Sequence, residues 1–163
     1  VIVNRALTPI SLQRGFTLLG MLLIVGAMGA GLAAYGTIHS HAAQREKEAE
    51  LLFRGTQYRL AIESYFRKAG TYPKKLEDLL VDNRFPTPLR HLRRPYADPM
   101  TGAADWGLME APEGGGIMGV YSSSEAPPIK RGNFPIEYLH FGEAKRYKDW
   151  QFFHSPSGPA PGQ

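Results

Sequence analysis

The stretch QRGFTLLGMLLIVGAMGAGLAAYG, Gln13 to Gly36, decides how the rest of this chain is interpreted. It begins with Arg14, and no charged residue follows before Arg45. Residues 16–38 are therefore uncharged, and about 20 apolar residues are enough for a helix to cross a bilayer. The apolar core of a secretory signal is shorter, about 7–15 residues. We therefore expect a retained transmembrane helix over about 16–38.

Charge and composition restrict the classes of protein to which the chain can belong. The chain has 163 residues, no cysteine and a net charge of +4. Arg5 and Arg14 precede the apolar stretch and favour a cytoplasmic N-terminus, with the remainder of the chain on the periplasmic side of the inner membrane. Without these two arginines, 17 basic residues face 15 acidic ones, a balance too even for a nucleic-acid-binding protein. The absence of cysteine excludes disulfides and thiolate chemistry.

Small residues recur within the apolar stretch. Gly26, Ala30 and Ala34 follow one another at steps of four, and Gly20 precedes them. Small residues at this spacing allow membrane helices to approach closely, so we expect these four residues to contribute to helix packing. The alternative is that glycine and alanine are simply common in membrane helices.

A helical pattern continues beyond the apolar stretch. Between Gln44 and Ala69, apolar residues recur mainly at steps of three and four, and charged residues occupy the other positions. Gly70 is suited to the position after a helix, and Pro73 prevents its continuation. We expect one helix over 16–69, whose second half packs one face on a folded body.

Three segments after the helix have the character of β-strands. They are 105–110, 117–122 and 149–154, and the glycine-rich turn 113–116 joins the first two. At least one of the tryptophans in these strands, Trp106 and Trp150, should be buried.

The fold class that these segments predict is α+β. A long N-terminal helix, transmembrane in its first half, packs on a small antiparallel β-sheet. The body covers 70–154, and the proline- and glycine-rich tail 155–163 should be disordered.

Candidate chemical residues do not form a recognisable catalytic or metal site. His39 and His41 lie two apart, which places them on different faces of a helix. The remaining histidines are scattered, and Ser122–Glu125 lacks the context of a nucleophile. Gly114–Gly116 lacks the Lys-Ser/Thr of a phosphate loop. We therefore expect no enzyme activity, no cofactor and no metal ion.

A basic cluster in the loop after the helix has two interpretations. Its members are Arg84, Arg90, Arg93 and Arg94. It could contact phosphate or an acidic partner, or it could be a solvated loop whose arginines pair with Asp82, Asp98 or Asp105. No aromatic residue between Arg90 and Arg94 offers stacking on bases, which favours the solvated loop.

The sequence resembles a known family at the start of the apolar stretch. Gln13-Arg14-Gly15-Phe16-Thr17-Leu18 is similar to the processing site of type IV pilins and type II secretion pseudopilins. The resemblance implies that a prepilin peptidase cuts after Gly15, discards the leader 1–15 and methylates the new N-terminal Phe16. The apolar helix is then kept for assembly.

Two weaker similarities and one departure accompany this motif. Gly70-Thr71-Tyr72-Pro73 and Tyr96-Ala97-Asp98-Pro99 resemble segments that follow the long helix in pseudopilins, in a G-type-like arrangement. The family normally has Glu at the fifth position after the cut, where this chain has Gly20. Major pseudopilins carry an Asp-rich calcium loop, whereas the corresponding 122–133 offers only Glu125 as a carboxylate, so we expect no calcium.

The resemblance implies a structural subunit of a type II secretion or related type IV filament machine, supporting protein export. Its partners would be other pseudopilin or pilin subunits, the prepilin peptidase, the inner-membrane assembly platform and the membrane, but not nucleic acid. Two alternatives remain open. One is a minor type IV pilin for DNA uptake or adhesion, and the other is a single-pass membrane-anchored sensor or enzyme.

Overall fold

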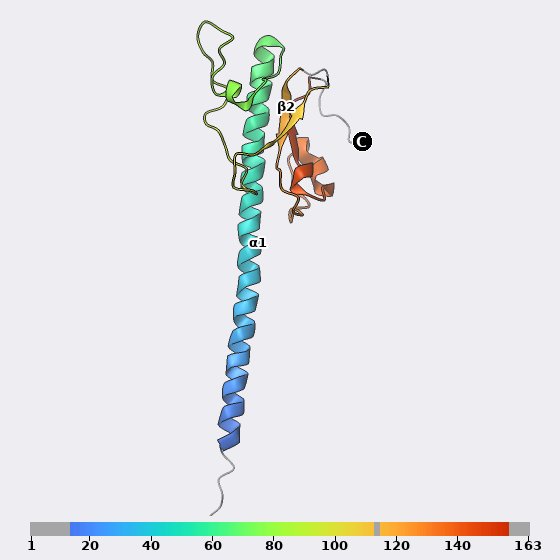
Figure 1. The fold of residues 1–163 in the computed structure, drawn as a ribbon. Helices are drawn as coiled ribbons and strands as arrows, with labels where there is room; N and C mark the ends of the chain where they lie inside the picture. The colour runs from blue at the N-terminus through green and yellow to red at the C-terminus, as the bar shows by residue number, and fades with distance from the viewer. Residues whose placement is uncertain (1–13, 113–114, 157–163) are drawn as a thin grey trace, which may run out of the picture. The chain divides into compact units, whose positions relative to one another are not determined.

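One long helix dominates the secondary structure. The computed structural model describes residues 14–112 and 115–156, and within the helix it describes the side chains of 17–28 and 41–69. Helix α1 runs from Arg14 to Ala69, 56 residues (Figure 1). It ends where predicted: Gly70 adopts a φ of +69°, and its N–H donates to the Phe66 carbonyl at 2.7 Å. Of the predicted leader, residues 1–13 lie outside the described part of the chain.

The prediction of a transmembrane first half is wrong. Among the residues that the structure describes, no helix is both long enough and apolar enough to cross a membrane.

A three-stranded antiparallel sheet follows the helix in the chain. Its strands are β1 (Gly107–Glu110), β2 (Ile117–Tyr121) and β3 (Gln151–Phe153). The strand order is β1-β2-β3, so that Val120 in the central strand is the Cα partner of both Leu108 and Phe152. All three strands fall within the segments predicted from the sequence.

The body, described by itself, is built on the C-terminal part of α1. The chain divides into two compact units, Val1–Ala42 and Ala43–Gln163. In the second unit, the sheet and the segment that joins β2 to β3 lie on one side of α1, and the loop that follows Gly70 lies on the other (Figure 1). Three 3-10 helices complete this unit: η1 (Leu76–Leu79), η2 (Ile136–Glu143) and η3 (Tyr147–Asp149).

An aromatic-rich core joins α1 to the sheet. Leu51 and Ile62 of α1 are fully buried, as is Phe152 of β3. Gly55 allows this packing, because a Cβ built on it would lie 2.4 Å from the Phe152 ring. Trp150 is also fully buried and stacks on Phe141 at a centroid distance of 5.4 Å. Trp106 is 7% exposed, so the prediction that at least one tryptophan is buried is confirmed.

Candidate functional site

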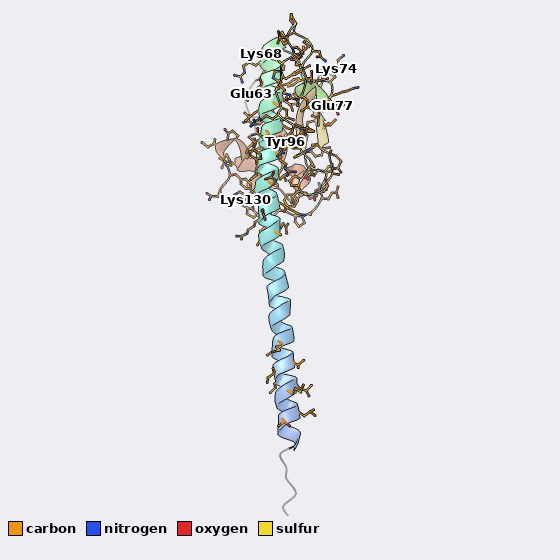
Figure 2. The ribbon with its side chains drawn as sticks, turned by 90° about the vertical axis from the view of Figure 1, so that its left-hand side faces the viewer. Glu63, Lys68, Lys74, Glu77, Tyr96 and Lys130 are labelled. Atoms are coloured by element: carbon orange, nitrogen blue, oxygen red, sulfur yellow. The ribbon has the colours of Figure 1, made fainter. Side chains whose placement is uncertain are left out.

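The N-terminal part of α1 exposes a continuous apolar surface. We call residues 17–28 the N-terminal apolar surface; their side chains project from the ribbon in Figure 2. Its large apolar side chains are each 57–68% exposed: Leu18, Leu19, Met21, Leu22, Leu23, Ile24, Val25 and Met28. Large exposed apolar patches on soluble proteins mark interaction sites, so this surface is the first candidate for function.

This surface extends around the helix and is not confined to one face. Successive residues of an α-helix are rotated by about 100°, because one turn takes about 3.6 residues. The five consecutive residues 21–25 are all apolar and all more than half exposed, so together they cover the full circumference. A helix that is apolar all round is stable only where apolar groups surround it. The chemistry offered here is association, not catalysis.

The residues predicted for processing and packing lie in or beside this surface. Gly15 and Phe16 belong to the first residues of α1, and their side chains lie outside the described part. Gly20 and Gly26 lie in open space, since a Cβ on either would meet no atom within 4 Å. The side chains of Ala30 and Ala34 are not among those described. The predicted contribution of these residues to helix packing stays a prediction.

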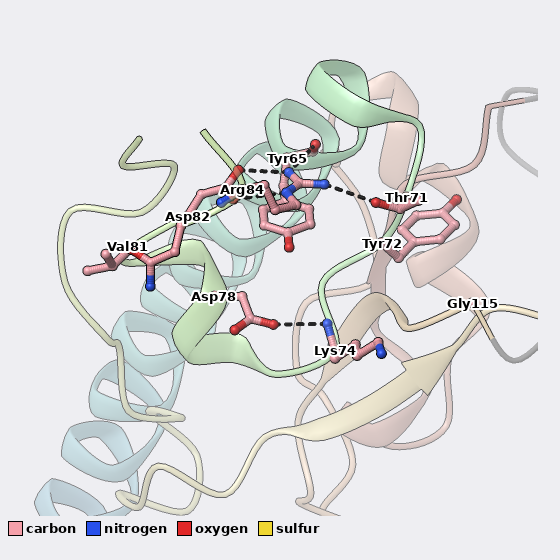
Figure 3. A pocket seen from close by; sticks show the side chains of 10 residues that line it. Tyr65, Thr71, Tyr72, Lys74, Asp78, Val81, Asp82, Arg84 and Gly115 are labelled. Atoms are coloured by element: carbon pink, nitrogen blue, oxygen red, sulfur yellow. Dashed lines mark hydrogen bonds and ion pairs between the residues drawn. The ribbon is translucent and has the colours of Figure 1, made fainter. Parts of the chain in front are cut away.

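The body contains a polar cluster around Arg84. Its guanidinium donates to both carboxylate oxygens of Asp82, at 2.8 and 2.7 Å, and to Thr71 Oγ1 at 2.9 Å (Figure 3). It also donates to the Tyr65 carbonyl at 3.1 Å and lies 3.4 Å from the centroid of the Tyr65 ring. Four of the five guanidinium N–H donors of arginine are thus in use. The Arg84 donors hold the pKa of Asp82 well below its usual value, although burial opposes the shift.

A cavity of about 530 Å³ adjoins this cluster (Figure 3). Asp82 and Arg84 line it together with Tyr65 and Lys74. With four donors engaged by its own neighbours, Arg84 has one N–H left to bind a phosphate or a carboxylate from outside. Among the described residues, Arg84 is the one member of the basic cluster that forms an ion pair, with Asp82; the pairing considered for Asp98 and Asp105 is not found.

His91, which the sequence shows as isolated, lies between a serine and an aspartate. Its Nδ1 is 2.9 Å from Ser64 Oγ on α1, and its Nε2 is 3.2 Å from Asp82 Oδ2. The residue types match a hydrolase triad, but the side chains of His91 and Asp82 are only 3% and 1% exposed. The cavity beside them is not lined by Ser64 or His91. The contacts join the loop that contains His91 and Asp82 to α1.

A second buried carboxylate fastens the segment between β2 and β3 to α1. Glu48 is 2% exposed, and it accepts hydrogen bonds from the backbone N–H groups of Ile129 and Lys130 at 2.5 and 3.1 Å. The Tyr147 hydroxyl also donates to Glu48, at 2.9 Å, and Gln44 donates to the Tyr147 oxygen at 2.7 Å. Burial raises the pKa of Tyr147 to about 12. We call this group the Glu48 clamp.

The Glu48 clamp holds the segment 122–133, which the sequence analysis considered for calcium. Within the described residues, no group of three or more histidine, aspartate or glutamate side chains is arranged to hold a metal ion. The charged group that holds this segment is the Glu48 carboxylate of α1. Sequence reasoning missed both Glu48 and Ser64, since nothing in the local pattern distinguishes them from other polar residues of the helix.

Comparison of the chain with protein-family models, with curated proteins and with solved structures finds no match.

Proposed function

We propose that this chain is a pseudopilin-like structural subunit of a type II secretion or related type IV filament machine. The observation that carries the proposal is the N-terminal apolar surface on a helix that also anchors a small body. Such a surface is stabilised by apolar partners on all sides, and the N-terminal helices of neighbouring subunits provide them.

The position of the processing motif supports this assignment. Gly15 and Phe16 lie directly before the N-terminal apolar surface, so a cut between them leaves that surface at the new N-terminus. The partners in this proposal are other pilin-like subunits, the prepilin peptidase and the assembly platform, with the body on the periplasmic side. Arg84 is largely engaged within its own chain, so a DNA-uptake role would depend on the other three arginines of the cluster.

Processing by a prepilin peptidase tests the proposal. When the full chain is expressed with the peptidase, we expect intact-mass measurement to show loss of residues 1–15 and one added methyl group on Phe16. Gly15→Glu should block the cut, because it replaces the glycine of the motif. Gly20→Ala, a change in open space on the same helix, is the matched control and should be processed normally. An unprocessed wild-type chain, or normal cutting of Gly15→Glu, would contradict the proposal.

A further inference from the structure

The helix η2 presents apolar side chains to solvent beside an acidic one. Ile136 is 87% exposed and Leu139 is 63% exposed, and the exposed Glu137 lies between them in the chain. We call these three residues the η2 knob. Exposed apolar side chains clustered beside a charge are a feature of protein interaction sites.

The η2 knob is held in place by its neighbours. Tyr138 and Phe141, in the same helix, are 4% and 0% exposed and stack on one another at 5.0 Å. The Tyr138 hydroxyl accepts a hydrogen bond from Arg59 Nε on α1 at 2.9 Å. Because the backbone under the knob is already ordered, binding through it costs less conformational entropy than binding through a free loop.

A pocket of complementary character lies elsewhere in the body, between α1 and the segment 129–132. It measures about 360 Å³. Its apolar lining comes from Ala49, Leu52 and Ile129, and its basic lining from Arg45, Lys130 and Arg131. We call it the α1 pocket.

The basic residues of the α1 pocket have few charged partners of their own: Arg131 donates to the Ala144 carbonyl at 2.6 Å, and the Lys130 ammonium lies 5.1 Å from the centre of the Phe134 ring. The carboxylate of Glu48 also lines the pocket, but it is engaged by the backbone N–H groups of Ile129 and Lys130. Within the described chain, neither Arg45 nor Lys130 forms an ion pair. The Glu48 clamp fixes one wall of the pocket, so this half of the contact is also ordered in advance.

We propose that the η2 knob of one copy of this chain docks into the α1 pocket of a second copy. The apolar side chains Ile136 and Leu139 meet the apolar lining, and Glu137 faces the basic residues. The knob does not fill the pocket of its own chain, because Ile136 is 87% exposed there. Since the two halves are different surfaces, the contact is head-to-tail and can repeat from copy to copy.

This inference rests on the proposed function, because the contact between knob and pocket is too small to hold two chains together by itself. A knob of three residues is much smaller than a stable interface, which buries about 1,200–2,000 Å². Association through the N-terminal apolar surface would hold the bodies at high effective concentration, and a weak contact is then occupied. In the assembly, the docking would set how one body lies against the next.

Cysteine cross-linking tests the docking, because the chain has no native cysteine. Two full-length chains with different tags are mixed in detergent, one carrying Ile136→Cys and the other Ala49→Cys, and then oxidised. The matched control replaces Ile136→Cys by Leu108→Cys, a 46% exposed residue of β1. We expect the knob pair to form roughly tenfold more mixed dimer than the control, a factor equivalent to about 1.4 kcal/mol.

Charge exchange makes the test specific. Glu137→Arg in the Ile136→Cys chain should remove most of the mixed dimer, and Arg45→Glu in the other chain should restore it. The pair Leu139→Cys with Ala49→Cys repeats the test without altering Ile136. Equal yields for the knob and control pairs, or indifference to Glu137→Arg, would overturn the inference.

A separate pair distinguishes this inference from the proposed function. Leu22→Cys in both chains reports association through the N-terminal apolar surface. Cross-linking at Leu22 without cross-linking between knob and pocket would overturn the docking alone. Absence of the Leu22 product, together with an unprocessed N-terminus, would count against the proposed function.

Discussion

Three buried carboxylates hold distant parts of the body together. Glu48, Asp82 and Asp98 are each at most 2% exposed. Asp98 accepts hydrogen bonds from the Met100 N–H at 2.8 Å and from Ser122 Oγ at 2.6 Å, and the other two have the partners described above. A buried charge is tolerated only when hydrogen-bond donors or opposite charges surround it. The body is thus fastened by polar contacts as well as by its aromatic core.

Asp82 makes the stability of the body dependent on pH. Arg84 lowers the pKa of this carboxyl in the folded state relative to about 3.9 in the unfolded chain. The contribution of Asp82 to the free energy of unfolding is therefore fully present above about pH 4 and is lost as the pH falls toward the folded-state pKa. We expect Asp82→Asn to reduce the free energy of unfolding at pH 7 by roughly 2 kcal/mol and to flatten its fall below pH 4. Urea denaturation at a series of pH values measures both effects.

Asp105→Asn is the control for this measurement. Asp105 is exposed and accepts a hydrogen bond from Thr101 Oγ1 at 2.7 Å. Its variant should keep the wild-type dependence on pH. If Asp82→Asn kept the wild-type slope below pH 4, the assigned effect of Arg84 on Asp82 would be wrong.

Helix α1 combines two kinds of apolar residue. Leu51 and Ile62 are fully buried in the core of the body, whereas Leu22 and Val25 are 63% and 57% exposed. The same residue types therefore serve stability in one part of the helix and association in the other. Substitutions in the two parts should separate these roles.

We expect Leu51→Ala to lower the free energy of unfolding of the body by about 2–5 kcal/mol, because it leaves a cavity in the core. Leu22→Ser combined with Val25→Ser should leave that free energy within about 0.5 kcal/mol of wild type, since exposed positions contribute little to it. The double variant should instead associate less. Chemical denaturation measures the first property, and sedimentation velocity in detergent measures the second. Wild-type association by the double variant would exclude the N-terminal apolar surface as the assembly site.

For the molecule as a whole, we expect Gly20 to prevent the chain from polymerising alone. In the family that the sequence resembles, a Glu at this position pairs with the free N-terminal amine of a neighbouring subunit. Gly20 offers no carboxylate, and an unpaired ammonium buried between subunits costs several kcal/mol. We therefore expect no long filaments when the wild-type chain is expressed with the assembly machinery but no other pilin. Electron microscopy of sheared surface material measures this.

Gly20→Glu should restore polymerisation, and the single chain has room for the new side chain, since a Cβ at this position meets no atom within 4 Å. Gly26→Glu is the matched control, because Gly26 is equally open but lies outside the pairing position. It should not polymerise. Long filaments of the wild-type chain alone would contradict the effect assigned to Gly20.

Local features of the fold could be predicted from the sequence, since local chemistry decides them. Gly70 ends α1 because glycine readily adopts a positive φ, and Pro73 cannot continue a helix. The alternation around Leu108 and Val120, joined by a glycine-rich turn, indicated the antiparallel pair β1–β2. The expected membrane span is not found: among the described residues, no helix is both long and apolar enough to cross a membrane.

Contacts between distant residues were decided only by the tertiary structure. Periodicity indicates that Gly55 faces the body, but not that the Phe152 ring lies against it. In the sequence, Glu48 does not differ from the other polar residues of α1. The fold brings to it the N–H groups of Ile129 and Lys130, which lie more than 80 residues away in the chain. The sequence alone determined the long helix, the three strand segments and the apolar stretch, because residue propensities and the spacing of apolar residues are local. The choice of partner for each buried polar group depended on tertiary packing, since many donors and acceptors are chemically equivalent until the chain is folded.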